Sequence, residues 1–187
     1  ESENPAPPAA DAISEALQHC NLDDLLLDSG TLTVAFADPA MTLDVGAAAK
    51  GYTAVQAGQA ARERGLPHAL LNMGGNVYTT GPKADGSAWC VGVENPWPGE
   101  DAPQYVQTVE LTGGDSLIVS GDYQRYFTYE GKRYSHLIDL TTGCPAAYYS
   151  SVAVYSSPDE GLGDLFSTAL FCLPPEQSRQ VADDNGL

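Results

Sequence analysis

Short runs in which hydrophobic and polar residues alternate cover much of the chain. Such alternation is typical of strands with one buried face. Two apolar runs that flank an Asp-Ser-Gly turn predict a hairpin over 25–36. A second hairpin, with its turn at Glu130-Gly131, is predicted over 123–138. Further strands are predicted over 41–44, 69–72, 77–79, 89–93, 106–111, 116–119 and 151–155.

Four segments instead repeat their apolar positions at helical spacing, and they predict helices over 11–20, about 50–64, 163–173 and 175–183. The small residues of 46–49 are interpreted as a turn between a strand that ends at Asp44 and the second of these helices. Gly65 is predicted to end that helix.

The order of these elements predicts an α+β fold. Strands follow one another in sequence-adjacent antiparallel pairs with helices between them, so we expect mixed, largely antiparallel sheets with packed helices. A chain of 187 residues is the length of one domain at about 150 residues per domain. We interpret residues 1–10, which are rich in Pro, Ala and Glu, as a linker or frayed end, and 11–187 as a single domain.

The net charge of the chain is strongly negative, which disfavours some classes of binding partner. Lys and Arg number 8 against 25 Asp and Glu, for a net charge of −17. This charge disfavours nucleic acids and anionic membrane surfaces. A small anionic ligand would need local help from a metal ion, backbone N–H groups or a placed lysine.

The start of the chain and its cysteines give little information about the compartment or about metal binding. It begins ESENPAPPAAD, without Met or a signal peptide, which we interpret as a processed end or the edge of a longer chain. No apolar run approaches the length of about 18 residues that a membrane span requires. Cys20, Cys90, Cys144 and Cys172 are widely spaced, which favours buried free thiols over a zinc site, although an even count permits disulfides.

Asp164 and Thr168 lie one turn apart on a predicted helix whose other residues are mostly apolar. A carboxylate and a hydroxyl on one helix face offer two oxygens to a hard cation such as Mg²⁺. The alternative is structural: Asp164 caps the helix and Thr168 bonds back to a helix carbonyl.

Lys50 is predicted at the start of a helix, beside Gly51. An ammonium group next to a helix N-terminus suits a phosphate or carboxylate, although a solvated surface lysine is the simpler interpretation. The surrounding AAAKG is not a P-loop, because the GxxxxGK[ST] pattern is absent.

His136 is a candidate general base near the end of a predicted strand. Strand alternation places Ile138 on the same face as His136 and Asp139 on the other, so Asp139 is not its orienting partner unless the strand bends. The alternative is a hydrogen-bonded or exposed histidine without a role, as we expect for His19 and His68. Gly74-Gly75 is a bulge or a place of close ligand approach, and Ser120–Tyr123 is expected to form a turn.

The chain resembles the ApbE family, the FAD:protein FMN transferases, over about residues 12–185. The resemblance rests on six segments in the family's order, each weak alone. They are LDVGAAAKGY (43–52), LLNMGGNVYTTG (70–81), WCVGVENP (89–96), SGDYQRYF (120–127), RYSHLIDLTTGCP (133–145) and GDLFSTAL (163–170).

The resemblance implies an α+β fold and Mg²⁺-dependent transfer of FMN from FAD to a Thr or Ser hydroxyl of a target protein, with release of AMP. It implies that Asp164, Thr168 and the carbonyl of Ala47 bind Mg²⁺. It also implies that Asp44, Lys50 and the Ile138 backbone contact FAD, and that His136 activates the acceptor hydroxyl. Acceptors in the family include subunits of membrane electron-transfer complexes. The family is bacterial and extracytoplasmic, either periplasmic or anchored by a lipid.

The sequence also departs from the family. The long region that precedes these motifs in family members is absent, and the chain stops where members usually continue, so we expect truncation at both ends. Gly46-Ala47-Ala48 replaces the family's GGI, and Leu140 replaces a proline. The alternatives are an FAD-binding protein or FAD pyrophosphatase without transfer activity, or a fragment that needs the missing N-terminal region.

Overall fold

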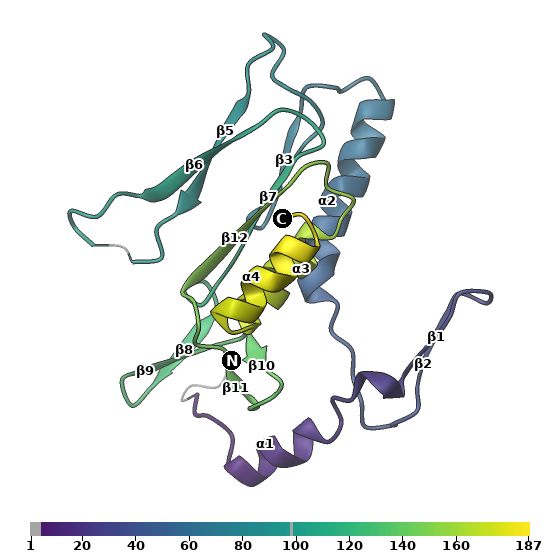
Figure 1. Ribbon diagram of the computed structural model, residues 1–187, viewed down its shortest axis with the longest axis vertical. Coiled ribbons are helices and arrows are strands. Elements are labelled where there is room, and N and C mark those ends of the chain that lie inside the picture. The colour runs from purple at the N-terminus through teal and green to yellow at the C-terminus, as the bar shows by residue number, and fades with distance from the viewer. Residues whose placement is uncertain (1–4, 98) are drawn as a thin grey trace.

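A four-stranded antiparallel sheet forms the centre of the fold (Figure 1). The computed structural model describes residues 5–97 and 99–187. The strand order in the sheet is β12-β7-β4-β3. The strands are β3 (Leu70–Met73), β4 (Asn76–Thr79), β7 (Ser116–Gly121) and β12 (Ser151–Ser156).

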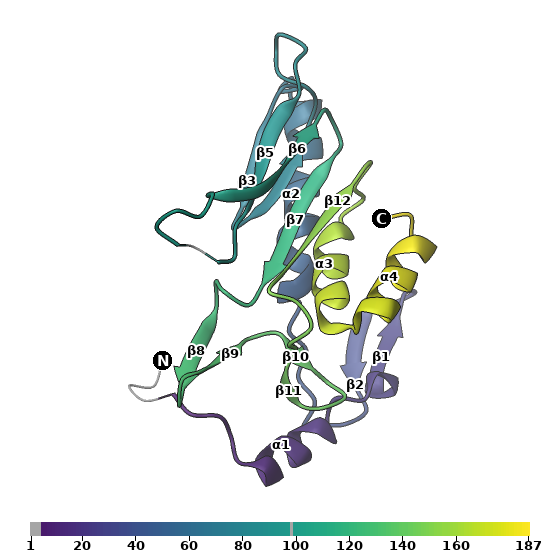
Figure 2. The same ribbon diagram turned by 60° about the vertical axis from the view of Figure 1, so that its left-hand side comes forward.

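The two faces of this sheet are covered differently, because neighbouring strand residues point to opposite sides. Tyr78 packs on one face against Ala54 and Val55 of helix α2 (Gly46–Glu63). The next residue along β4, Val77, packs on the other face against the hairpin of β5 and β6. These strands are β5 (Trp89–Glu94) and β6 (Tyr105–Leu111). Figure 2 shows the hairpin and the helices on opposite sides of the sheet.

Alternation along β7 brings polar residues toward helix α3 (Gly163–Cys172). Leu117 and Val119 join the apolar cluster on the β5–β6 side. Ile118 lies on the helix side, where its Cδ1 is 2.6 Å from the position that a Cβ on Gly163 would take. Ser120, one alternation further, hydrogen-bonds to Ser167 of α3. This strand therefore delivers a hydroxyl to the face that carries Asp164 and Thr168.

The remaining elements surround this centre. Two-stranded antiparallel pairs are formed by β1 with β2, β8 with β9 and β10 with β11. Their bounds are β1 (Leu25–Asp28), β2 (Thr33–Phe36), β8 (Tyr126–Tyr129), β9 (Lys132–Ser135), β10 (Ile138–Asp139) and β11 (Cys144–Pro145). The helices are α1 (Ala10–Leu17), a 3₁₀ turn at Leu22–Asp24 and α4 (Pro175–Asp184).

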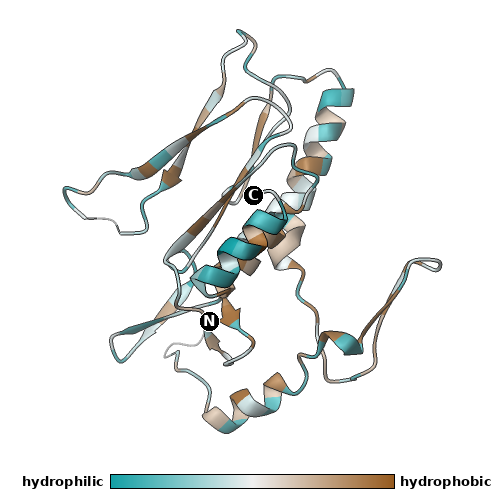
Figure 3. Ribbon diagram, in the orientation of Figure 1, coloured by the Kyte–Doolittle hydropathy of each residue, from teal (hydrophilic) through white to brown (hydrophobic). Residues whose placement is uncertain are grey.

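The β1–β2 hairpin stands apart from the rest of the chain in Figure 1, and its strands carry several hydrophobic residues (Figure 3). Leu27 is 71% exposed and Val34 is 56% exposed. Within the described part of the chain, no helix is both long and apolar enough to cross a membrane.

The predicted α+β fold class is confirmed: β3 to β12 follow one another between helices α2 and α3, and every strand pair in the described residues is antiparallel. Both hairpins and all four helices form, with bounds that differ from the predicted ones by up to four residues. The division into an end segment up to residue 10 and a single domain from residue 11 stays a prediction.

Three local predictions were wrong. Helix α2 begins at Gly46, so 46–49 are its first turn, and the alanines there favour helix over a turn. No strand forms over 41–44, where Asp44 instead accepts the N–H of Gly46 at 2.7 Å and helps to start the helix. Of the four free cysteines, Cys20, Cys90 and Cys144 are exposed rather than buried.

Candidate active site

All seven residues proposed for the site from the sequence line one cavity of about 380 Å³. They come from segments far apart in the chain: the start of α2, the turn into β10, and α3. These residues are Asp44, Ala47, Lys50, His136, Ile138, Asp164 and Thr168. Ser120, Gln124 and Arg125 complete the polar wall.

Asp164 occupies the contact between α2 and α3. The helices approach so closely that a Cβ on Gly51 would lie 2.5 Å from the Cβ of Asp164. The N–H of Gly51 donates to Asp164 Oδ2 at 2.9 Å, and Oδ1 lies 3.9 Å from the Nζ of Lys50. The structural alternative, in which Asp164 caps its own helix, is wrong. Asp159 caps this helix instead, because its Oδ1 accepts the N–H groups of Gly161, Leu162 and Gly163.

The same contact affects the carbonyl of Ala47. In a regular α-helix the N–H of Gly51 would donate to the carbonyl oxygen four residues earlier, which is that of Ala47. Here the N–H of Gly51 is directed to the Asp164 carboxylate. A carbonyl oxygen has two lone pairs, so that of Ala47 has acceptor capacity for a ligand at the edge of the cavity.

The hydroxyl of Thr168 is held by a side chain of β7 rather than by its own helix. Its Oγ1 lies 3.2 Å from the Oγ of Ser120. The hydroxyl that bonds back to a helix carbonyl belongs to the neighbouring Ser167, which donates to Asp164 O at 2.9 Å.

Lys50 lies in the second turn of α2, not at its start, because the helix begins earlier than the sequence indicated. Its side chain is half exposed, and its ammonium group faces the Asp164 carboxylate. The hydrocarbon part of Lys50 passes Gly74, where an added Cβ would be 3.8 Å from Lys50 Cδ. The lysine is thus at the cavity wall and free to meet an anionic ligand.

A backbone carbonyl orients His136. Both the N–H and the ring Nδ1 of His136 lie 3.2 Å from the carbonyl oxygen of Arg125. Because a carbonyl only accepts, Nδ1 carries the hydrogen in the neutral ring, and Nε2 is the basic nitrogen. Asp139 instead accepts the N–H and hydroxyl of Thr141 at 2.8 and 2.7 Å, so it is not the orienting partner of His136. The predicted strand is interrupted at 136–137, so simple alternation does not apply there.

The backbone of Ile138 points away from its partner strand. The carbonyls of the two flanking residues, Leu137 and Asp139, accept from Ala146 and Gly143. Successive residues of a strand direct their N–H and C=O groups to alternate sides, so those of Ile138 face the other way. They remain available to a ligand in the cavity.

The donors at the cavity are hard oxygens. Asp164, Thr168 and Ala47 offer a carboxylate, a hydroxyl and a carbonyl, which is a set suited to Mg²⁺. Burial raises the pKa of the Cys172 thiol, with a further contribution from Asp139, so this lining residue is not a thiolate at neutral pH. Among the described residues, no group of three or more His, Cys, Asp or Glu side chains forms a metal cluster.

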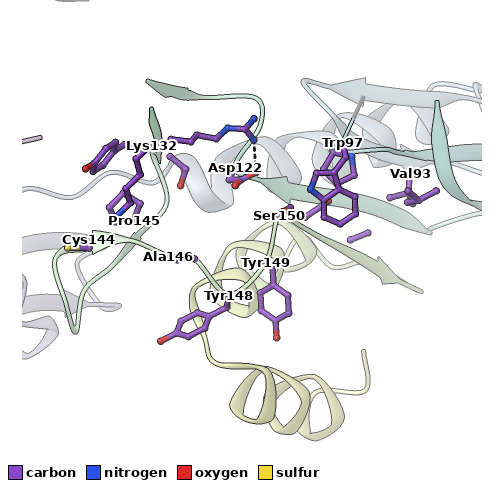
Figure 4. A pocket seen from close by; sticks show the side chains of 18 residues that line it. Val93, Trp97, Asp122, Lys132, Cys144, Pro145, Ala146, Tyr148, Tyr149 and Ser150 are labelled. Atoms are coloured by element: carbon purple, nitrogen blue, oxygen red, sulfur yellow. Dashed lines mark hydrogen bonds and ion pairs between the residues drawn. The ribbon is translucent and has the colours of Figure 1, made fainter. Parts of the chain in front are cut away.

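A larger cavity of about 690 Å³ is lined by residues of β9, β11 and β12 and of the β5–β6 hairpin (Figure 4). Its wall includes the aromatic side chains of Trp97, Tyr148 and Tyr149. The dashed line at Asp122 in Figure 4 marks its ion pair with Arg133, at 3.4 Å. None of the seven predicted residues lines this cavity.

Sequence reasoning missed the residues that hold the site together. Ser120 was assigned to a turn, although β7 continues through Gly121. Its alternation with Ser116 and Ile118 was the signal that could have placed it on the helix side. Ser167 and Gly51 act through contacts between separate segments, which no local pattern reveals.

Comparisons of the sequence and of the fold with known proteins find the same group of relatives. A FAD:protein FMN transferase of Klebsiella pneumoniae (strain 342) is 35% identical over 171 residues, covering 91% of this chain and 51% of that protein. One from Treponema pallidum (strain Nichols) is 35% identical over 187 residues, covering 92% and 51%. The crystal structure of the ApbE protein from Thermotoga maritima MSB8 superposes with a TM-score of 0.86 at 33% identity, covering 100% of this chain and 58% of that one.

The chain thus spans about half the length of the curated relatives that it matches. The profile of the ApbE family matches residues 1–187. The order of the motifs, the fold and this match agree, and the chain belongs to the ApbE family.

Proposed function

We propose that this chain carries the catalytic centre for Mg²⁺-dependent transfer of FMN from FAD to a Thr or Ser hydroxyl of a target protein. The observation that carries the proposal is the convergence of seven residues from separate segments on one cavity. The names of the relatives, FAD:protein FMN transferases, support the reaction.

Lys50 and the N-terminal turn of α2 would bind the diphosphate of FAD. The ammonium group of Lys50, which faces the Asp164 carboxylate, supplies local positive charge at the cavity wall in a chain of net charge −17. Asp44, which accepts the N–H of Gly46, and the outward-facing backbone of Ile138 would position the rest of the substrate. These local contacts would bind FAD even though the protein as a whole is negatively charged.

Asp164, Thr168 and the carbonyl of Ala47 would hold Mg²⁺. When bound, the ion offsets the negative charge of the diphosphate and the charge that develops on departing AMP. Gly51 keeps Oδ2 of Asp164 occupied, so Oδ1 is the oxygen that faces Lys50 and the cavity.

His136 would act as the general base. Nε2 accepts the proton of the acceptor hydroxyl, while the hydroxyl oxygen bonds to the phosphorus that carries riboflavin. The bond from that phosphorus to the bridging oxygen breaks, and AMP leaves with that oxygen. The carbonyl of Arg125 keeps the proton of the neutral ring on Nδ1 throughout.

In-gel flavin fluorescence tests the proposal. The chain is incubated with FAD, Mg²⁺ and an acceptor protein that has a threonine in a flavinylation motif, with and without EDTA. A fluorescent acceptor band that EDTA abolishes is the expected result. Free FMN and AMP without a band would indicate a pyrophosphatase instead, and FAD bound unchanged would indicate a binding protein.

Two histidine variants separate catalysis from binding. His136→Ala is expected to lower transfer about 100-fold or more, as general-base loss does, and to leave FAD binding within about twofold. His68→Ala is the matched control, because its ring contacts Pro82 O away from the cavity. Equal transfer by both variants would remove His136 from the mechanism.

The acceptor and the compartment also remain proposals. The resemblance supports a subunit of a bacterial membrane electron-transfer complex as the acceptor. It equally supports a periplasmic or lipid-anchored location for the protein.

A further inference from the structure

Three hydroxyl groups form a continuous chain beside the cavity. The Oγ of Ser120 on β7 lies 2.8 Å from the Oγ of Ser167 and 3.2 Å from the Oγ1 of Thr168. The hydroxyl of Ser167 donates to the backbone carbonyl of Asp164 at 2.9 Å. Ser167 is fully buried, whereas Ser120 and Thr168 line the cavity.

Counting protons fixes the direction of every bond in this chain. Each hydroxyl has one proton. Ser167 gives its proton to the Asp164 carbonyl, which can only accept, so Ser167 must accept from Ser120. Ser120 has then used its own proton, and its contact with Thr168 requires that Thr168 donate.

The result is that the proton of Thr168 is directed into the protein. With its proton committed to Ser120, Thr168 offers only lone pairs to the cavity. A free threonine hydroxyl in a helix commonly rotates to a carbonyl of the preceding turn, or directs its proton at a nearby carboxylate. Either arrangement would weaken it as a ligand for a cation.

We infer that Ser120 and Ser167 are positioning residues that hold Thr168 as an acceptor for the divalent cation, acting through its hydroxyl and not by touching the ion. This inference rests on the proposed function, which makes Thr168 a ligand. Hydrogen bonds behind a metal ligand fix its orientation and raise its basicity. The bond from Ser167 to the Asp164 carbonyl also ties this chain to the residue that supplies the carboxylate.

Mn²⁺ affinity, measured from the EPR signal of the free ion, tests the inference without any turnover. Ser120→Ala and Ser167→Ala are each expected to weaken binding about 10-fold or more. Ser116→Ala is the matched control and should leave affinity unchanged. Ser116 lies on the same side of β7 and is buried, but its hydroxyl has no hydrogen-bond partner within the described part of the chain.

A double-mutant cycle shows whether Ser120 acts through Thr168. Thr168→Val removes the ligand, and adding Ser120→Ala to it should cause no further loss of affinity. A purely structural effect of Ser120 would instead add to that of Thr168→Val. Thermal unfolding by circular dichroism checks that each variant is folded. If Ser120→Ala does not fold, Ser167→Ala takes its place in the test.

The outcomes distinguish a failure of this inference from a failure of the proposed metal site on which it rests. If Thr168→Val weakens Mn²⁺ binding while Ser120→Ala and Ser167→Ala match Ser116→Ala, the hydroxyl chain has no positioning role and the metal site stands. If the unaltered chain does not bind Mn²⁺, or Thr168→Val binds it equally well, both the metal site and this inference are wrong.

Discussion

At the scale of single residues, the contact between Gly51 and Asp164 sets the geometry of the site. It brings two helices together where only a glycine fits, and it directs a backbone N–H to the carboxylate. A side chain at this position cannot be relieved by a flexible neighbour, since the atom it would meet is the Cβ of Asp164. The residue therefore couples helix packing to the orientation of a proposed metal ligand.

Gly51→Ala is predicted to disturb both properties. The added methyl group would lie 2.5 Å from Asp164 Cβ, so the helices must separate, at a cost of about 1–3 kcal/mol in the free energy of unfolding. Urea denaturation measures this cost, with Gln59→Ala on an exposed face of α2 as a control expected within about 0.5 kcal/mol of the unaltered chain. An equally stable Gly51→Ala would contradict the packing argument.

Lys50 is predicted to supply local positive charge for FAD. Lys50→Met should weaken FAD binding about 10-fold, which corresponds to about 1.4 kcal/mol, whereas Lys83→Met should have little effect. Both variants change the net charge equally, but Lys83 lies over the ring of Trp89 and not at the cavity. Titration of FAD fluorescence measures the affinities, and similar losses in both would mean that overall charge, not the site, decides binding.

At the scale of elements, buried carboxylates hold the loops that start α3. Asp115 accepts the N–H groups of Thr112 and Gly113 at 2.6 and 3.1 Å and the hydroxyl of Ser157. Burial acts to raise the pKa of Asp115, but these hydrogen bonds outweigh it and lower the pKa below its ordinary value of 3.8. The charged form is thus the one that the folded state favours.

Asp115→Asn is therefore predicted to remove a pH-dependent part of the stability. A lowered pKa in the folded state stabilises above the unfolded value of 3.8, and this stabilisation disappears as the pH falls through the folded pKa. The variant should be less stable than the unaltered chain at neutral pH, and the difference should shrink toward acid. Urea midpoints across this range measure it, and a difference that grows on acidification would contradict the assignment.

Local patterns predicted the elements well but not how they meet. Alternation located the strands, and helical spacing located the helices, because both reflect burial of one face. Sequence-adjacent strands were expected to pair with one another, yet β6 pairs with β5 while the next strand, β7, joins β4 and β12. The roles of Ser120, Ser167 and Gly51 depend on such long-range pairings, which one sequence does not encode locally.

The convergence of the seven site residues could be expected only from the family resemblance. Spacing alone left a structural alternative for Asp164, Thr168, Lys50 and His136. The structure brings them to one cavity, and it gives the helix-capping role to Asp159 instead.

At the scale of the whole molecule, the net charge of −17 opposes the approach of anionic FAD. Raising the salt concentration from about 0.01 M to about 0.15 M shortens the screening length from about 30 Å to about 8 Å. Long-range repulsion is then screened while contacts inside the cavity are less affected. We predict that FAD associates faster at the higher salt concentration, as stopped-flow fluorescence would measure, and a slower rate would show that local attraction dominates the approach.

The central claim is that one cavity binds FAD together with a hard divalent cation. A crystal structure of the chain with FAD and Mn²⁺ tests it most directly, through the anomalous signal of the metal. We predict an anomalous peak within about 2.5 Å of Asp164 Oδ1, Thr168 Oγ1 and the carbonyl oxygen of Ala47, with the FAD diphosphate beside it. A peak elsewhere, or FAD bound outside this cavity, would contradict the claim.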